Sequence, residues 1–113
     1  SGVGMKISIF GMGYVGVVSG SCLASLGHEV IGVDLNPLKV QMVGEGRSPI
    51  VETGLEPLML EQVKSGRLRS TTDTAEAVRA SDVAFISVGT PSDRNGSVSL
   101  AAVDKVVEMV LLV

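Results

Sequence analysis

The chain has 113 residues, 45% of them hydrophobic and 19% charged, which is typical of a folded globular domain and excludes a disordered segment. Its net charge of −3 and the lack of a basic patch argue against nucleic acid or an anionic membrane as the main partner. No apolar run approaches the roughly 20 residues that cross a bilayer, and the single cysteine, Cys22, excludes an internal disulfide and fits a reducing, cytoplasmic setting.

Residues 1–4 precede a methionine and are expected to be a cloning remnant, with Met5 as the natural start. Residues 6–10 form an apolar run that predicts the first strand. The sequence Gly-Met-Gly-Tyr-Val-Gly follows at positions 11–16 and leads into a segment with helical spacing, and a second apolar run ends at Asp34. A glycine turn between a strand and a helix, with an acid at the end of the next strand, predicts a dinucleotide-binding site.

The glycine turn assigns a separate task to each glycine. Gly11 permits the tight turn out of the strand, Gly13 lets the backbone approach a pyrophosphate, and Gly16 allows the helix to pack closely on the strand. Tyr14 and Val15 would offer their backbone N–H groups to the phosphates. Their side chains are left free for other roles, Val15 as a core residue and Tyr14 as a surface ring.

The predicted first helix covers residues 14–26 and ends at a glycine. Val15, Val18, Cys22 and Leu26 share one face at helical spacing, so we expect this face to pack against the core. Cys22 is accordingly predicted to be a small buried residue and not a nucleophile.

Asp34 ends the predicted second strand, at residues 29–34, where the adenosine ribose of a dinucleotide should lie. A carboxylate there can accept hydrogen bonds from the ribose hydroxyls and repels the 2′-phosphate of NADP, so the predicted cofactor is NAD. The alternative is that Asp34 caps the helix that begins at Pro37. Lys39 could turn back toward the ribose or the phosphates, or it could be a solvated surface lysine.

The rest of the chain continues the alternation of strands and helices. Asp73 stands at the cap position of a short helix, with the spacing of a capping box to Glu76. The sequence predicts a helix from residue 37 to about 44–46, and further helices over 55–64 and 73–80. It predicts strands at 68–72 and 82–88, and loops at 47–54 and 89–98. A final amphipathic helix is marked by Leu100, Val103, Val107 and Val110.

This alternation predicts an α/β fold: a Rossmann-type parallel sheet, strand order 3-2-1-4, with helices on both faces. Only four strands are predicted, so the sheet should be truncated before its second half is complete. In this order the sequence Val-Gly-Thr-Pro at 88–91 faces the glycine turn across the crevice, where Thr90 offers a hydroxyl and an N–H. The alternative is an ordinary turn. No catalytic triad or metal-ligand cluster is recognisable.

The chain resembles the UDP-glucose and GDP-mannose 6-dehydrogenases from Met5 onward. The matching stretches are residues 9–16, 27–34, 48–55 (Ser-Pro-Ile-Val-Glu-Thr-Gly-Leu) and 88–91, and the combination of the last two is the specific part. Residues 5–113 would then be the NAD-binding Rossmann domain. The residue types at positions 9–11 and 48–52 look closer to those of the GDP-mannose branch of the family. One departure is Thr53, where the family commonly has proline.

The resemblance implies that two NAD oxidise the sugar C6 alcohol to a carboxylate. It assigns NAD binding to the backbone of Tyr14 and Val15 and to Asp34, Lys39 and Thr90, and it places Pro49 and Glu52 in a loop beside the cofactor cleft. The family's catalytic cysteine and its sugar-nucleotide domain would lie beyond residue 113, so we expect this chain alone to bind NAD without oxidising a sugar nucleotide. Two other interpretations stay open: a stand-alone NAD-binding module, and a homo-oligomer that pairs an exposed sheet edge or the final helix.

Overall fold

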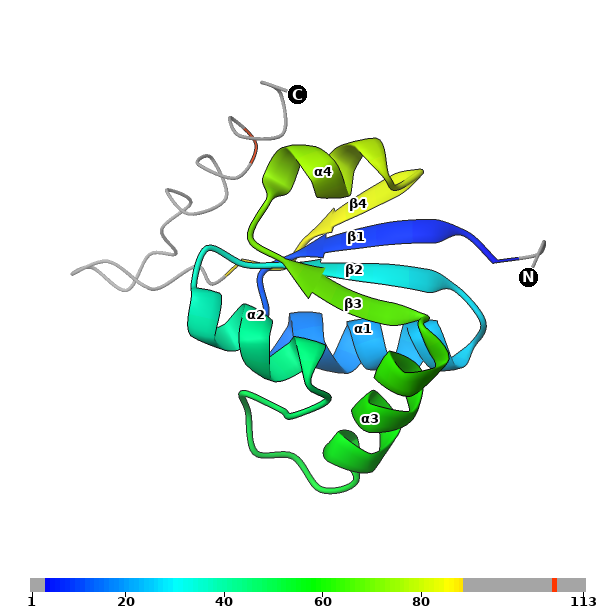
Figure 1. Ribbon diagram of the computed structural model, residues 1–113, viewed down its shortest axis with the longest axis vertical. Helices are drawn as coiled ribbons and strands as arrows, with labels where there is room; N and C mark the ends of the chain where they lie inside the picture. Colours follow the sequence, from blue (N-terminus) through cyan, green and yellow to red (C-terminus); the bar gives the residue numbers. More distant parts are fainter. Residues whose placement is uncertain (1–3, 89–106, 108–113) are drawn as a thin grey trace, which may run out of the picture.

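The computed structural model describes residues 4–88 and Val107, and they form a parallel sheet with helices on both faces (Figure 1). Thr90, the predicted loop at 89–98 and the predicted final helix, apart from Val107, lie outside the described residues. In chain order the elements are β1 (Lys6–Phe10), α1 (Tyr14–Ser25), β2 (Glu29–Val33), α2 (Pro37–Gly44), α3 (Leu55–Ser65), β3 (Leu68–Thr71), α4 (Thr74–Arg79) and β4 (Val83–Ile86).

The strand order is β3-β2-β1-β4 and every pairing is parallel, which confirms the predicted topology. Ile9 in β1 is opposite Gly32 in β2 on one side and Phe85 in β4 on the other. The chain builds the sheet outward from β1 to β3 and then crosses back to β4. The carboxyl ends of β1 and β4 are therefore the point where the strand order reverses, which is where open α/β sheets bind ligands.

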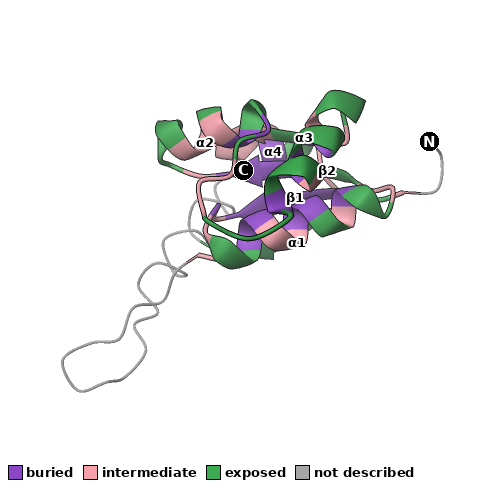
Figure 2. Ribbon diagram, turned by 90° about the horizontal axis from the view of Figure 1, so that it is seen from below, coloured by how far each residue is buried: buried purple, intermediate pink, exposed green. Residues whose placement is uncertain are grey.

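Helices α1, α2 and α3 lie on one face of the sheet, and α4 lies on the other (Figure 1). The buried residues concentrate on β1, β2 and the inner faces of the helices, while β4 and the outer helix surfaces are mostly exposed (Figure 2). The larger core cluster joins the sheet to α1, α2 and α3, and its buried members are Ile7, Ile9, Met12, Val17, Ala24, Val30, Val43, Leu55, Met59 and Leu68.

Helix α1 contacts the sheet through a different face from the one predicted. Val15 and Leu26 are 60% and 75% exposed and Cys22 is also exposed, so the prediction that they face the core is wrong. Of the four predicted residues, Val18 alone packs against the core, and it is partly buried. The buried face consists mostly of small residues, namely Gly16, Val17, Gly20, Ser21 and Ala24. Small side chains allow a closer approach of the helix to the strands, and a pattern of large apolar residues does not reveal such a face.

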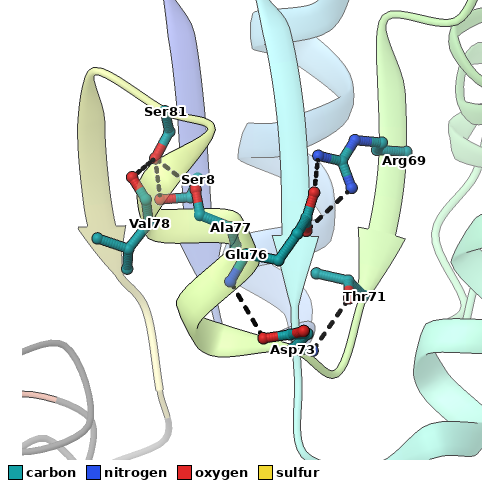
Figure 3. Close-up of polar contacts among 8 residues, drawn as sticks. All are labelled: Ser8, Arg69, Thr71, Asp73, Glu76, Ala77, Val78 and Ser81. Atoms are coloured by element: carbon teal, nitrogen blue, oxygen red, sulfur yellow. Dashed lines mark hydrogen bonds and ion pairs between the residues drawn. The ribbon is translucent and has the colours of Figure 1, made fainter. Parts of the chain in front are cut away.

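Helix α4 covers the second face of the sheet through Ala77, which packs with Phe10, Ile31 and Val33. The predicted cap is confirmed, because Asp73 accepts a hydrogen bond of 3.0 Å from the backbone N–H of Glu76 (Figure 3). The capping box is incomplete, since the carboxylate of Glu76 pairs with Arg69 of β3 instead. This ion pair is half-exposed and ties α4 to the edge strand.

None of the described helices is long and apolar enough to cross a membrane.

Candidate functional site

The turn between β1 and α1 requires glycine at two of its three glycine positions for reasons internal to the fold. Gly11 has a φ of +105°, a conformation that side chains disfavour. A Cβ at Gly16 would lie 1.8 Å from the carbonyl oxygen of Gly11. Gly11 therefore makes the turn and Gly16 brings α1 against it, as their spacing predicted.

Gly13 has neither of these constraints. Its φ is −88°, which any residue can adopt, and an added Cβ would meet nothing within 4 Å among the described residues. The packing of residues 4–88 therefore does not need glycine here. A Cβ would instead fill the open space in front of the turn, which is the space that a pyrophosphate approaching the backbone would occupy.

The N-terminus of α1 carries no competing group of its own. Gly13 is the N-cap, no side chain caps the helix, and its first turn holds no acidic residue. Within residues 4–88, no acceptor bonds the backbone N–H groups of Gly13, Tyr14, Val15 or Gly16. These groups and the helix dipole together suit a bound anion.

Asp34 lies directly after β2 and connects two backbone segments. Its Oδ2 accepts a hydrogen bond of 2.8 Å from the N–H of Met12, and its Oδ1 accepts one of 2.9 Å from the N–H of Asn36. The N-cap of α2 is Asn36, whose side chain accepts from the Leu38 N–H, so the alternative of Asp34 as the cap is wrong. Each carboxylate oxygen of Asp34 keeps a second lone pair, which is available to ribose hydroxyls.

The other predicted binding residues are placed less closely. Tyr14 and Val15 begin α1 with exposed side chains, so the expected core role of Val15 is wrong. Lys39 is half-buried in the first turn of α2, and nothing in the described contacts brings it to the glycine turn. Thr90 lies outside the described residues.

The loop of residues 47–54 reaches the glycine turn through Glu52. The Glu52 carboxylate lies close enough to the Tyr14 phenol to favour its protonated form by hydrogen bonding and to repel its ionised form, and both effects raise the pKa of Tyr14 above its ordinary value. The resemblance placed Glu52 beside the cofactor cleft, and its position next to Tyr14 agrees with that placement. The loop also lines an open pocket of about 370 Å³ with Ser48, Ile50 and Val51.

Two residues of the site were not predicted from the sequence. The N–H of Ser87 donates to the Phe10 carbonyl at 2.8 Å, and its Oγ lies 3.2 Å from that oxygen and 3.1 Å from the Gly11 carbonyl oxygen. Met12 is 2% exposed and fixes the turn in the core. The sequence signal that could have identified Ser87 is its position at the end of a strand predicted to border the switch point. The signal that could have identified Met12 as a core residue is its apolar side chain.

Residues 4–88 contain no group of three or more His, Cys, Asp or Glu side chains that could hold a metal ion. The site therefore consists of backbone N–H groups, one carboxylate and a half-exposed phenol. These groups suit the recognition of a phosphorylated nucleoside.

Comparisons with known proteins show the family of the chain. Residues 5–113 match the family model described as "UDP-glucose/GDP-mannose dehydrogenase family, NAD binding domain". The chain is 56% identical over 102 residues to the GDP-mannose 6-dehydrogenase of Pseudomonas putida, covering 90% of this chain and 23% of that protein. It is 52% identical over 90 residues to the UDP-glucose 6-dehydrogenase of Rhizobium meliloti, covering 80% of this chain and 21% of that protein.

A solved structure has the same fold. The crystal structure of a ternary complex of GDP-mannose dehydrogenase from Pseudomonas aeruginosa superposes with a TM-score of 0.92 at 51% identity, covering 94% of this chain and 24% of that one. The chain thus spans about a quarter of the length of the relatives it matches.

Proposed function

The chain belongs to the UDP-glucose/GDP-mannose dehydrogenase family as its NAD-binding domain, and we propose that it serves a nucleotide-sugar 6-dehydrogenase that oxidises GDP-mannose to GDP-mannuronate. Family membership supports the cofactor. Bound NAD supplies a hydride acceptor, and the oxidation of a C6 alcohol to a carboxylate removes four electrons, so it consumes two NAD for each sugar. The residues of this chain bind and orient the cofactor.

The observation that carries the proposed NAD site is the open space at Gly13. Gly13, which the packing of residues 4–88 does not require to be glycine, begins a run of four N–H groups that have no acceptor within this part of the chain, and a pyrophosphate would satisfy these groups. We therefore assign the pyrophosphate to the backbone of Gly13, Tyr14 and Val15, with Gly11 and Gly16 shaping the turn.

We assign the adenosine ribose to Asp34. Its position after β2 and its remaining lone pairs support this role, and its negative charge disfavours the 2′-phosphate of NADP. Lys39 and Thr90 are proposed as further NAD contacts from the family resemblance alone. Lys39 could compensate the phosphate charge from α2, and Thr90 could donate its hydroxyl or N–H across the switch point.

The choice of sugar nucleotide follows the similarity of the chain to named enzymes. GDP-mannose 6-dehydrogenases from several Pseudomonas species are 51–56% identical over 102 residues. The UDP-glucose 6-dehydrogenase of Rhizobium meliloti reaches 52% over a shorter stretch of 90 residues. GDP-mannose is therefore our first candidate, and UDP-glucose, giving UDP-glucuronate, is the second.

Calorimetric titration of the chain with NAD and, separately, with NADP tests the cofactor site. We expect NAD to bind and NADP to bind much more weakly, and equal binding of both would contradict the role of Asp34. The sugar is tested on the full-length enzyme that carries this domain, by the absorbance of NADH at saturating NAD. GDP-mannose should yield two NADH per sugar, while turnover of UDP-glucose alone would favour the second candidate.

A further inference from the structure

One peptide unit of the glycine turn is held at both of its ends. The carbonyl of Gly11 accepts a hydrogen bond from the Ser87 hydroxyl at 3.1 Å, and the N–H of the same peptide, which belongs to Met12, donates to Asp34 at 2.8 Å. Ser87 directly follows β4 and Asp34 directly follows β2, so the two bonds come from the strands on either side of β1.

A peptide group is planar, so fixing its C=O and its N–H together fixes the orientation of the whole plane. The plane between Gly11 and Met12 immediately precedes the unbonded N–H groups of Gly13, Tyr14 and Val15. Its orientation fixes the starting plane from which, with φ and ψ of Met12 and Gly13, the direction of those N–H groups follows. A turn that is already ordered has less conformational entropy to lose when an anion binds.

We propose that Ser87 is a positioning residue that, opposite Asp34, holds the Gly11–Met12 peptide and thereby pre-orders the glycine turn for a pyrophosphate. The ligand in this proposal rests on the proposed NAD function, whereas the holding of the peptide does not. Asp34 has a second proposed role at the ribose, so Ser87 is the residue that separates the two effects.

The Ser87 hydroxyl is not needed for strand pairing. The pairing of β1 with β4 ends at Phe10 and Ile86, and the backbone N–H of Ser87 already bonds the Phe10 carbonyl at 2.8 Å. The hydroxyl, whose single proton is shared between the Phe10 carbonyl at 3.2 Å and the Gly11 carbonyl at 3.1 Å, reaches one residue further than the strand pairing. Ser8 provides a matched contrast, because its hydroxyl lies between the same two strands, 3.5 Å from the Val83 carbonyl, and away from the turn.

The first measurement is amide hydrogen exchange by NMR on the full chain. We expect the Met12 amide to exchange more slowly than the amide of Val51, whose fully exposed loop position has no described backbone bond. Ser87→Ala should speed the exchange of Met12 roughly three- to tenfold, the equivalent of one lost neutral hydrogen bond. Ser8→Ala should leave Met12 unchanged, and Ser87→Thr, which keeps the hydroxyl, should retain the protection.

The second measurement is the dissociation constant for NAD. Ser87→Ala should weaken NAD binding roughly three- to tenfold, while Ser8→Ala should not. Unchanged Met12 exchange and unchanged NAD affinity in Ser87→Ala would each overturn the proposal, as would equal effects of the two alanine variants.

The hydrogen-exchange measurement and the NAD-binding measurement also distinguish a failure of this proposal from a failure of the proposed function. If the wild-type chain bound no NAD, the cofactor assignment would fail, and the exchange of Met12 would still decide whether Ser87 holds the turn. If Ser87→Ala did not fold, Ser87→Cys, which replaces the hydroxyl with a weaker donor of similar size, would decide. Faster exchange of Met12 in Ser87→Cys would support the held peptide, and unchanged exchange would contradict it.

Discussion

The Met12 side chain lies against the α-carbon of Gly32 in the neighbouring strand, and a Cβ at residue 32 would stand 2.5 Å from the Met12 sulfur. Met12 belongs to the glycine turn, and Gly32 is opposite Ile9 in the middle of the sheet. The contact therefore couples the packing of β2 to the position of the turn. It also explains why a strand that is buried along most of its length contains a glycine.

Gly32→Ala should destabilise the chain by about 1–3 kcal/mol, because the added methyl group overpacks the core and displaces Met12. Chemical denaturation with circular dichroism measures this change. Gly20→Ala is the matched control, since its Cβ would meet Ile9 at an ordinary contact distance of 3.4 Å and would also raise helix propensity. Equal destabilisation by the two substitutions would contradict the specific role of Met12.

Gly13→Val should separate binding from folding. The side chain enters open space, so the free energy of unfolding should change by about 1 kcal/mol or less, while NAD binding should be lost through steric exclusion. Gly16→Ala should instead prevent folding, because its methyl group would clash with the Gly11 carbonyl. Calorimetric titration and thermal melting distinguish the two, and NAD binding to Gly13→Val at wild-type affinity would refute the pyrophosphate assignment.

Asp34→Ala should weaken NAD binding by about 1–3 kcal/mol, the value of a lost charged hydrogen bond. Asp34→Asn should reduce the preference for NAD over NADP, because the amide removes the charge that repels the 2′-phosphate. Titrating both cofactors into each variant measures the two effects. Unchanged NAD affinity in Asp34→Ala would exclude the ribose role.

Tyr14 provides an internal spectroscopic probe, since it is the only tyrosine of the chain and there is no tryptophan. The hydrogen bond to Glu52 and the charge of that carboxylate raise the pKa of Tyr14. The bond requires the protonated phenol, so it is present at neutral pH and is lost as the pH rises through the raised pKa. The alkaline absorbance of tyrosinate follows this ionisation directly.

Glu52→Gln should lower the pKa of Tyr14 toward its ordinary value, because the negative charge is removed and the amide is a weaker acceptor. Glu61→Gln is the control: it removes an exposed charge on α3, outside the loop of residues 47–54, and should leave the pKa of Tyr14 unchanged. An unchanged pKa in Glu52→Gln would show that the loop of residues 47–54 does not rest on the glycine turn in solution.

The sequence predicted the order of the sheet because the alternation of strands and helices, together with the glycine turn, restricts the topology to very few arrangements. It predicted the tasks of Gly11 and Gly16 because their spacing fixes the local geometry. The face of α1 was predicted wrongly, since its contact with the sheet depends on Gly20 and Ser21 more than on large apolar side chains. The bond from Ser87 to Gly11 joins residues 76 positions apart, and no local pattern encodes it.

The contrast between Gly13 and its two neighbouring glycines has an evolutionary consequence. Folding constrains Gly11 and Gly16 whether or not a nucleotide ever binds, whereas among residues 4–88 nothing in the packing constrains Gly13, and the proposed ligand would be what does. A descendant of this domain that abandoned its cofactor and kept its architecture would be free to replace Gly13 first. Among related sequences, the loss of the middle glycine alone would therefore mark a pseudoenzyme, and the loss of either outer glycine would mark a changed fold.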